Sequence, residues 1–259
     1  MTRFALRIEY NGSAFHGWQF QKNRPSIQEH LESALSRVAD EKITVFCAGR
    51  TDAGVHATHQ IVHYDTTATR ALKAWVFGVN AYLPPAIAVR NVYEVDDTFH
   101  ARFDALSRSY RYIIDNRTTR PAINAGQITW YCLELDALKM NEAAQLLIGE
   151  HDFTSFRSSQ CESKTPIRCI HSITVVRENH QIIINITANA FLHHMVRNIV
   201  GTLLEVGIGR QPPDWVAQVL EARDRRKASI TALAAGLYLV GVTYPPRYQV
   251  LFDTDKKII

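Results

Sequence analysis

The 259-residue chain lacks several features that mark specialised classes of protein. Its few cysteines contain no Cys-x-x-Cys spacing, so the sequence predicts neither a zinc ribbon nor a redox-active thiol pair. No apolar run approaches the length of a membrane span, and the polar start at Met1 to Arg3 has no apolar signal-peptide core. We therefore expect reduced cysteines and a soluble protein of the cytoplasm.

The excess of positive charge is also small, at +4 near neutral pH with an isoelectric point of about 8.9. Its distribution is more informative than its sum. One basic segment is interleaved with aromatic residues and comprises Arg108, Tyr110, Arg111, Tyr112, Arg117 and Arg120. That combination suits a phosphate backbone with exposed bases, so we predict RNA-backbone contacts from Arg108, Arg111 and Arg117. A second basic group, Arg223, Arg225, Arg226 and Lys227, is typical of a solvated surface.

A short loop from residue 48 to 57 concentrates the features of a reactive site. Arg50 stands two positions before Asp52, and Gly49 and Gly54 flank the pair. Glycines permit positive φ and close approach of another molecule. A carboxylate beside a guanidinium can stay ionised where water is excluded. The alternative is an ordinary polar turn with an ion pair between Arg50 and Asp52.

Hydropathy patterns predict an α+β fold. Alternation indicates half-buried strands, and apolar spacings of three and four indicate helices. In the first part we expect strands at 4–10, 43–47, 60–64 and 88–95, with helices from Ser26 and over 71–80. In the second part we expect strands at 109–115, 128–132, 170–177, 181–188 and 237–243, with helices over 136–148 and from 191 and 214. The βαββαβ order of the first part returns loosely in the second, which favours two antiparallel sheets with helices on one face.

Six ordered blocks across nearly the whole chain resemble the TruA-type tRNA pseudouridine synthases. Besides the loop at 48–57, they are residues 10–28, 99–112, 152–156, 190–201 and 236–239. The resemblance implies two ferredoxin-like or RRM-like subdomains whose sheets join edge to edge, with the active cleft between them. The corresponding ranges are an N-terminal domain at 1–104 with the catalytic loop, a C-terminal domain at 105–247 and a tail at 248–259.

The same resemblance implies an activity, a substrate and an assembly. It implies isomerisation of uridine to pseudouridine at positions 38, 39 and 40 in the anticodon stem-loop of tRNA, without cofactor or metal. It also implies a homodimer in which one tRNA contacts both subunits.

Pseudouridine formation needs a carboxylate to attack the nucleoside or stabilise the sugar cation, and a means of extracting the nucleotide from its stack. Asp52 resembles the family nucleophile, and Arg197, in an otherwise apolar helix, is the expected ion-pair partner that keeps Asp52 charged. Arg50 is expected to face RNA. Tyr110 resembles the substrate-contacting tyrosine, with its ring on the uracil and its hydroxyl near the departing proton, and Leu237 resembles the opposite wall.

Two other functions compete with this interpretation. His56, His59 and His63 are spaced by three and four residues and could bind the metal ion of a hydrolase. The pattern favours structural or RNA-contacting histidines, because no carboxylate-rich segment adjoins them. A non-catalytic RNA-binding protein is the other alternative, and the set of Asp52, Arg50, Tyr110 and Arg197 argues against it.

Overall fold

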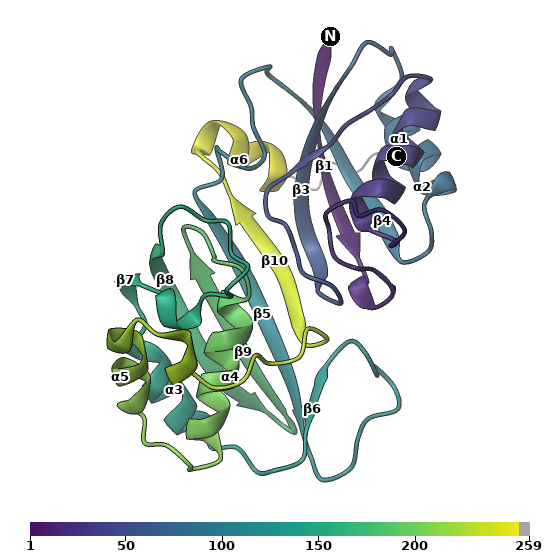
Figure 1. Ribbon diagram of the computed structural model, residues 1–259. Helices are drawn as coiled ribbons and strands as arrows, with labels where there is room; N and C mark the ends of the chain where they lie inside the picture. Colours follow the sequence, from purple (N-terminus) through teal and green to yellow (C-terminus); the bar gives the residue numbers. More distant parts are fainter. Residues whose placement is uncertain (254–259) are drawn as a thin grey trace. The chain divides into compact units, whose positions relative to one another are not determined.

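Residues 1–253 are described by a computed structural model of the chain, without the side chains of residues 250, 251 and 253. They form an α+β protein, as the hydropathy patterns predict (Figure 1). The fold divides into unit 1, which comprises Met1–Leu106 and the residues from Leu239 on, and unit 2, Ser107–Tyr238. The sequence placed residues 239–247 in the C-terminal domain, whereas here they belong to the same unit as the N-terminus.

In unit 1, the strands lie in the order β4-β1-β3-β10, and β2 pairs with β3. Their bounds are β1 Thr2–Tyr10, β2 Phe46–Cys47, β3 His56–Thr66, β4 Ile87–Val95 and β10 Leu237–Thr243, which begins in unit 2. β1 is antiparallel to both β3 and β4. Phe4, Leu6, Ile8 and Tyr10 are buried in β1, so the alternation seen in the sequence marks the core face.

Helices of unit 1 pack together beside this sheet (Figure 1). The helices that pack together are α1 Ile27–Ala39, the π-helical turn η2 Ala74–Gly78, and α2 Val79–Tyr82, whereas the short η1 Gly12–Ala14 contacts β3. The α1 helix begins where the sequence predicts, since the Ser26 side chain accepts a hydrogen bond from the Glu29 amide at 3.4 Å. The Phe4 ring meets Trp75 of η2 at 5.6 Å between centroids, which joins the sheet to the helical layer.

The segment predicted as a tail contains a helix, α6 Pro246–Asp253. Tyr248 and Phe252 are buried, and their rings lie 4.8 and 5.8 Å from the Phe99 ring. The Tyr248 hydroxyl also donates to Asp96 Oδ1 at 2.9 Å. The first part of the predicted tail is therefore packed in unit 1, and residues 254–259, with Lys256 and Lys257, lie outside the described residues.

In unit 2, the strands lie in the order β5-β9-β8-β7, each antiparallel to its neighbour, and β6 is parallel to β5. Its strands are β5 Ser107–Asn116, β6 Thr129–Tyr131, β7 Gly149–Asp152, β8 Ile167–Glu178 and β9 Gln181–Ala188. Its helices are α3 Ala137–Gln145, η3 Thr154–Phe156, α4 Met195–Gly207, α5 Trp215–Ala222 and η4 Arg225–Lys227. The short β7 was not predicted from the sequence.

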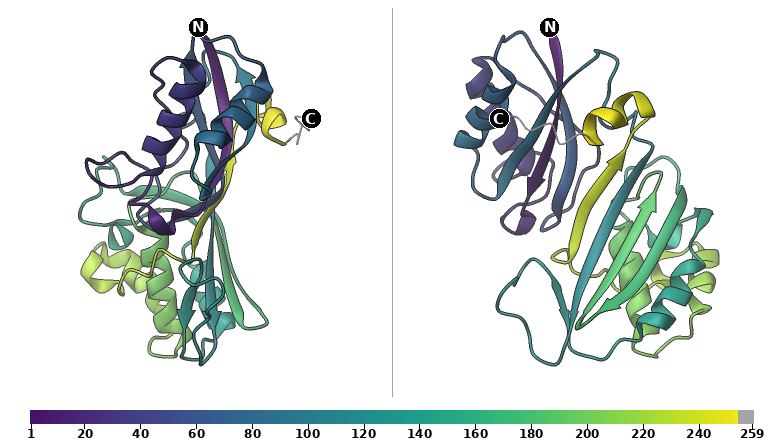
Figure 2. Two further views of the ribbon diagram at one scale, coloured as in Figure 1. Left: turned by 90° about the vertical axis from the view of Figure 1, so that its right-hand side faces the viewer. Right: turned by 180° about the vertical axis from the view of Figure 1, so that it is seen from behind.

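Alternation decides which face of the unit 2 sheet is covered. On β5, Tyr110, Tyr112 and Ile114 are buried opposite Ile186, Ile184 and Ile182 of β9. Helices α3 and α4 cover this face, and the opposite face is more exposed, as at Thr174 and Val176 of β8 (Figure 2). Alternate side chains of β5 therefore occupy different environments, because one set points toward the helices and the other set points toward the more exposed face.

Candidate active site

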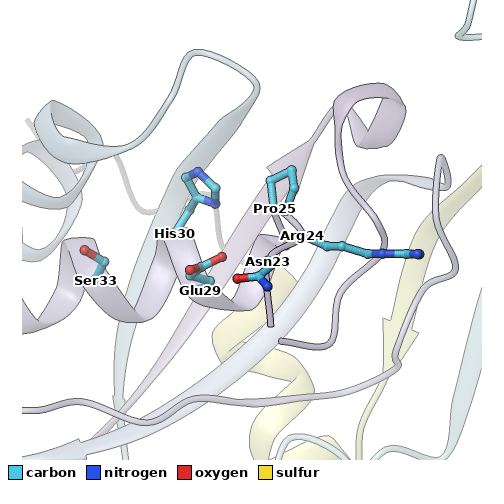
Figure 3. Close-up of a pocket in the computed structure, with 6 residues that line it drawn as sticks. All are labelled: Asn23, Arg24, Pro25, Glu29, His30 and Ser33. Carbon is cyan, nitrogen blue, oxygen red and sulfur yellow. The ribbon is translucent and has the colours of Figure 1, made fainter. Parts of the chain in front are cut away.

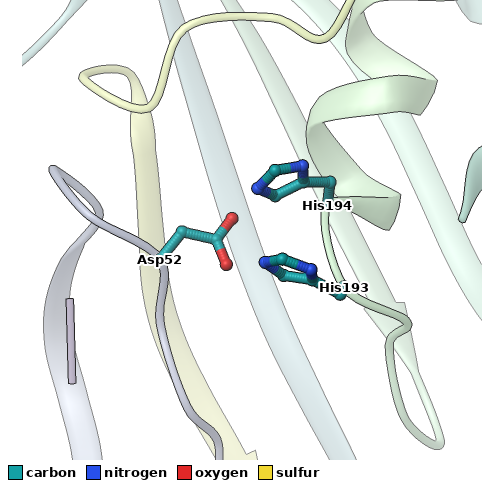
Figure 4. A group of neighbouring side chains, drawn as sticks. All are labelled: Asp52, His193 and His194. Atoms are coloured by element: carbon teal, nitrogen blue, oxygen red, sulfur yellow. The ribbon is translucent and has the colours of Figure 1, made fainter. Parts of the chain in front are cut away.

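The loop that carries Asp52 joins β2 to β3 and is fixed by the segment after β1. The Trp18 amide donates to the Thr51 carbonyl at 2.9 Å, and the Gly54 amide donates to the Phe15 carbonyl at 3.2 Å. The Tyr10 and Thr51 hydroxyl groups lie 2.8 Å apart. Backbone bonds on both sides of Asp52 thus hold it half-buried at the surface of unit 1 (Figure 4).

Gly17 allows this close approach of two backbone segments. Its φ is +90°, and a Cβ at this position would lie 2.7 Å from the Thr51 carbonyl oxygen and 3.0 Å from the Asp52 carbonyl carbon. Only glycine combines that conformation with that contact at low cost. The sequence block at 10–28 therefore supports the reactive loop mechanically, a role that its residue types alone did not reveal.

Gln60 holds the start of the loop from the β3 side. Its buried side chain donates to the Gly49 carbonyl at 2.6 Å and accepts from the Gly49 amide at 3.3 Å. Gly54 has a φ of 77°, as a turn glycine would, whereas Gly49 does not adopt a positive φ. Arg50 is exposed, and the described residues include no ion-pair partner for it, so the simple Arg50–Asp52 pair is not formed.

In unit 2, Tyr110 lies on the helix-covered face of β5. Its side chain is buried, and its ring meets Phe191 edge to face, with 5.0 Å between centroids and an interplanar angle of 85°. Burial against an aromatic ring fixes the plane of the phenol. Tyr110 is therefore held in one orientation within unit 2.

Arg197 lies in the first turn of α4 and is half-buried. Its Nε donates to the Ala232 carbonyl at 2.8 Å, and the Ala232 amide donates to the Arg197 carbonyl at 3.1 Å. The side chain is thus tied to the segment after η4 rather than extended into solvent. Directly before α4, the rings of His193 and His194 lie 4.0 Å apart and are drawn with Asp52 in Figure 4. The sequence analysis did not single out this pair.

Leu237 is the first residue of β10 and is buried. Its amide donates to the Ala234 carbonyl at 2.9 Å, and the preceding Gly236 carbonyl accepts from the Ile113 amide of β5 at 2.9 Å. An apolar wall at this position is thus anchored to the same strand as Tyr110.

The three arginines predicted to contact the RNA backbone do not share one surface. Arg108 and Arg111 are three positions apart on β5, so they project from opposite faces. Arg117 pairs with Asp115 at 2.9 Å, and that carboxylate is fully buried. Residues three positions apart on a strand cannot lie on the same face, which the sequence argument overlooked. Arg117, in turn, has a structural partner.

The histidines considered as metal ligands do not converge. His56 and His63 lie at positions 1 and 8 of an extended strand, roughly 23 Å apart at about 3.3 Å per residue. The Nδ1 of His56 accepts from the Gly12 amide at 3.0 Å, and the Nδ1 of His63 accepts from the Ala101 amide at 3.1 Å. Burial, with a contribution from nearby His100, lowers the pKa of His63 to about 4. His56 and His63 therefore each hold a backbone amide of another segment.

A surface cavity of about 500 Å³ lies beside the start of α1 (Figure 3). It is lined by Asn23, Arg24, Pro25, Glu29, His30 and Ser33, none of which belongs to the predicted site. Among residues 1–253, no helix has the length and apolarity needed to cross a bilayer.

Comparison with known proteins agrees with the sequence blocks. The family model described as "tRNA pseudouridine synthase" matches residues 7–104 and 143–245. A protein of Shewanella sp. (strain ANA-3) named tRNA pseudouridine synthase A is 58% identical over 248 residues, which is 96% of this chain and 95% of the relative. The protein of the same name from Shewanella baltica (strain OS195) is 57% identical with the same coverage.

Among solved structures, a Cbf5-Nop10-Gar1 complex has a chain that matches with a TM-score of 0.34 and 10% identity. The match covers 91% of this chain and 57% of that one. Since the family model spans most of the chain and the relatives match nearly all of it, the chain belongs to the tRNA pseudouridine synthases, the isomerases that convert uridine to pseudouridine in tRNA.

Proposed function

We propose that this member of the family acts in the cytoplasm on uridines 38, 39 and 40 of the anticodon stem-loop, with Asp52 as nucleophile and no cofactor. The observation that carries the role of Asp52 is the clamp on its loop, where the Thr51 carbonyl and Asp52 backbone lie against Gly17. A nucleophile that must meet a flipped nucleotide gains from a backbone that is fixed before binding.

In the proposed reaction, the Asp52 carboxylate attacks the nucleoside and the bond between N1 and C1′ breaks. The detached uracil turns, C5 bonds to C1′, and the bond to Asp52 breaks. C5 then loses its proton and N1 gains one, so the product is an isomer of the substrate. We propose that the Arg197 guanidinium keeps Asp52 ionised, since an opposite charge nearby favours the charged form. The Tyr110 hydroxyl would accept the C5 proton, with Leu237 as the apolar wall and Arg50 facing the RNA.

The family resemblance further implies that the two sheets join, that the reaction takes place between the units, and that the enzyme is a homodimer. We include these features in the proposal. A concentration-independent monomer mass in sedimentation equilibrium would contradict the homodimer without affecting the role of Asp52.

The decisive experiment measures release of tritium from tRNA labelled at C5 of uridine, with transcripts that carry a single uridine at position 38, 39 or 40. Asp52→Asn should bind these transcripts with unchanged affinity and lose at least about 10⁴-fold in single-turnover rate, because the amide keeps the shape and removes the nucleophile. The exposed Asp40→Asn, in unit 1, is the matched control. Turnover near the wild-type rate in Asp52→Asn would refute the assignment, and no release by the wild-type enzyme from any of the three transcripts would refute the substrate positions.

A further inference from the structure

One arginine of the second basic group is unlike its neighbours. Arg223, Arg226 and Lys227 are exposed, whereas Arg225 is half-buried. Arg226 pairs with the nearby Asp224 at 2.9 Å, with 89% of its own side chain exposed. The sequence interpreted the whole group as a solvated surface, and for Arg225 this interpretation was wrong.

The Arg225 guanidinium binds neutral oxygen atoms of the segment that follows it and of α4. Its Nη1 donates to the Ser229 carbonyl at 2.9 Å, and its Nη2 donates to Asn198 Oδ1 at 3.0 Å and Thr231 Oγ1 at 3.1 Å. Burial lowers the pKa of Arg225, so holding a charge there has a cost. The fork of donors offsets that cost by fixing three acceptors at once.

Asn198, the residue after Arg197 on α4, is the centre of this network. Its side chain is fully buried, and its Nδ2 donates to the Phe156 carbonyl at 2.8 Å. Its Oδ1 accepts from Arg225 and also from the Thr231 hydroxyl at 2.7 Å. The amide can satisfy all of these partners in only one orientation, so it sets where Thr231 lies relative to α4.

The segment at 228–232 lies directly on α4. A Cβ at Gly201 would overlap the Ile230 carbonyl oxygen, so the two backbones touch at this position. The next residues place the Ala232 carbonyl where it accepts from Arg197 Nε at 2.8 Å. The direction of the Arg197 side chain therefore depends on a segment that Arg225 holds.

We propose that Arg225 is a positioning residue for the isomerisation, acting through Thr231 and the Ala232 carbonyl to aim the guanidinium of Arg197. This inference rests on the proposed function, in which Arg197 keeps the nucleophile charged. Arg225 itself touches no reacting group. It fixes the Ala232 carbonyl, which restrains Arg197. Without Arg225, the segment at 228–232 shifts relative to α4.

Arg225→Ala should lower kcat by about 10- to 100-fold, as expected for a small displacement of an active-site group, with KM for tRNA changed less than twofold. Arg225→Lys should be intermediate, since an ammonium cannot reproduce the planar fork. Arg226→Ala, which removes the same charge one residue away, is the matched control and should retain wild-type kcat. If Arg225→Ala fails to fold by its melting curve, Thr231→Val takes its place and should lower kcat by about threefold or more.

A double-mutant cycle separates positioning from a general loss of structure. In an Arg197→Ala background, replacing Arg225 should have no further effect on the single-turnover rate, because the group it aims is gone. Fully additive effects, or wild-type kcat in both Arg225→Ala and Thr231→Val, would overturn the inference. Wild-type turnover in Arg197→Ala would instead overturn the proposed role of Arg197, so the two failures are distinguishable.

Discussion

The Asp52 loop of unit 1 and the Arg197 segment of unit 2 are held in place by different kinds of contact. The Asp52 loop is fixed through backbone hydrogen bonds to residues 15 and 18 and by close contact at Gly17. Arg197 is restrained by a carbonyl whose own segment depends on the side chains of Arg225, Asn198 and Thr231. The glycines of the Asp52 loop itself are recognisable in the sequence, whereas a side-chain network of this kind leaves no comparable local pattern.

The largest expected effect tests whether a side chain of unit 2 contributes an atom to the chemistry. Tyr110→Phe keeps the ring that packs on Phe191 and removes only the hydroxyl. If that hydroxyl accepts the C5 proton, the chemical step should slow by about 10²- to 10⁴-fold while tRNA affinity is preserved. Single-turnover release of C5 tritium measures this, with Tyr131→Phe as the control. A near-normal rate would mean that the ring acts by stacking alone.

The next effect tests the backbone clamp of unit 1. Gly17→Ala places a Cβ 2.7 Å from the Thr51 carbonyl oxygen at a φ of +90°, so the loop must shift. A displacement of about 1 Å at the nucleophile should cost about 10²-fold in turnover. Gly209→Ala is the matched control, because its φ of +74° is similarly strained but no atom lies within 4 Å. Equal losses of activity in both variants would show that backbone strain, and not the contact with the loop, is responsible.

A smaller effect distinguishes the two faces of β5. Arg108 shares the face of Tyr110, whereas Arg111 lies on the other face, where its Nε donates to Asn185 Oδ1 at 2.9 Å. In a plot of log affinity for tRNA against log salt concentration, Arg108→Ala should reduce the slope by the contribution of about one phosphate contact. Arg111→Ala should leave the slope unchanged. Binding titrations between low and physiological salt measure both slopes. Flattening in Arg111→Ala alone would place the RNA on the open face of the sheet.

The smallest effect concerns the pH dependence of stability in unit 1. Burial lowers the pKa of His63 to about 4 from an ordinary value of 6.5, with His100 and Arg3 adding to the effect and Asp65 and Asp104 opposing it. The unfolded chain binds this proton more readily, so the stabilisation is complete above pH 6.5 and is lost as the pH falls toward 4. His63→Gln should reduce the slope of melting temperature against pH over this interval. The exposed His171→Gln should leave the slope unchanged, and an identical slope in His63→Gln would refute the assignment.

Local patterns predicted most strands and helices because, in an element with one buried face, apolar residues recur with the period of that strand or helix. Residues 4–10 alternate in sequence, and the buried side chains of β1 are the apolar ones. The same reasoning missed α6 because its buried residues, Tyr248 and Phe252, stabilise it by packing on Phe99, which is distant in sequence. It also began β3 too late, because the pairing with β1 contains a bulge between Ala57 and Gln60 that interrupts the alternation.

The sequence by itself determined the α+β class, the family and the identity of the loop around Asp52, because periodicity and motifs are properties of neighbouring residues. Only the tertiary structure decided that Gly17 supports this loop, that Arg108 and Arg111 lie on different faces, and that Arg225 is half-buried against α4 while Arg226 is exposed. These features depend on which distant segments pack together, and close packing distinguishes adjacent residues that are chemically identical. Arg225 and Arg226 differ in what the fold places beside them, and that difference cannot be read from either residue alone.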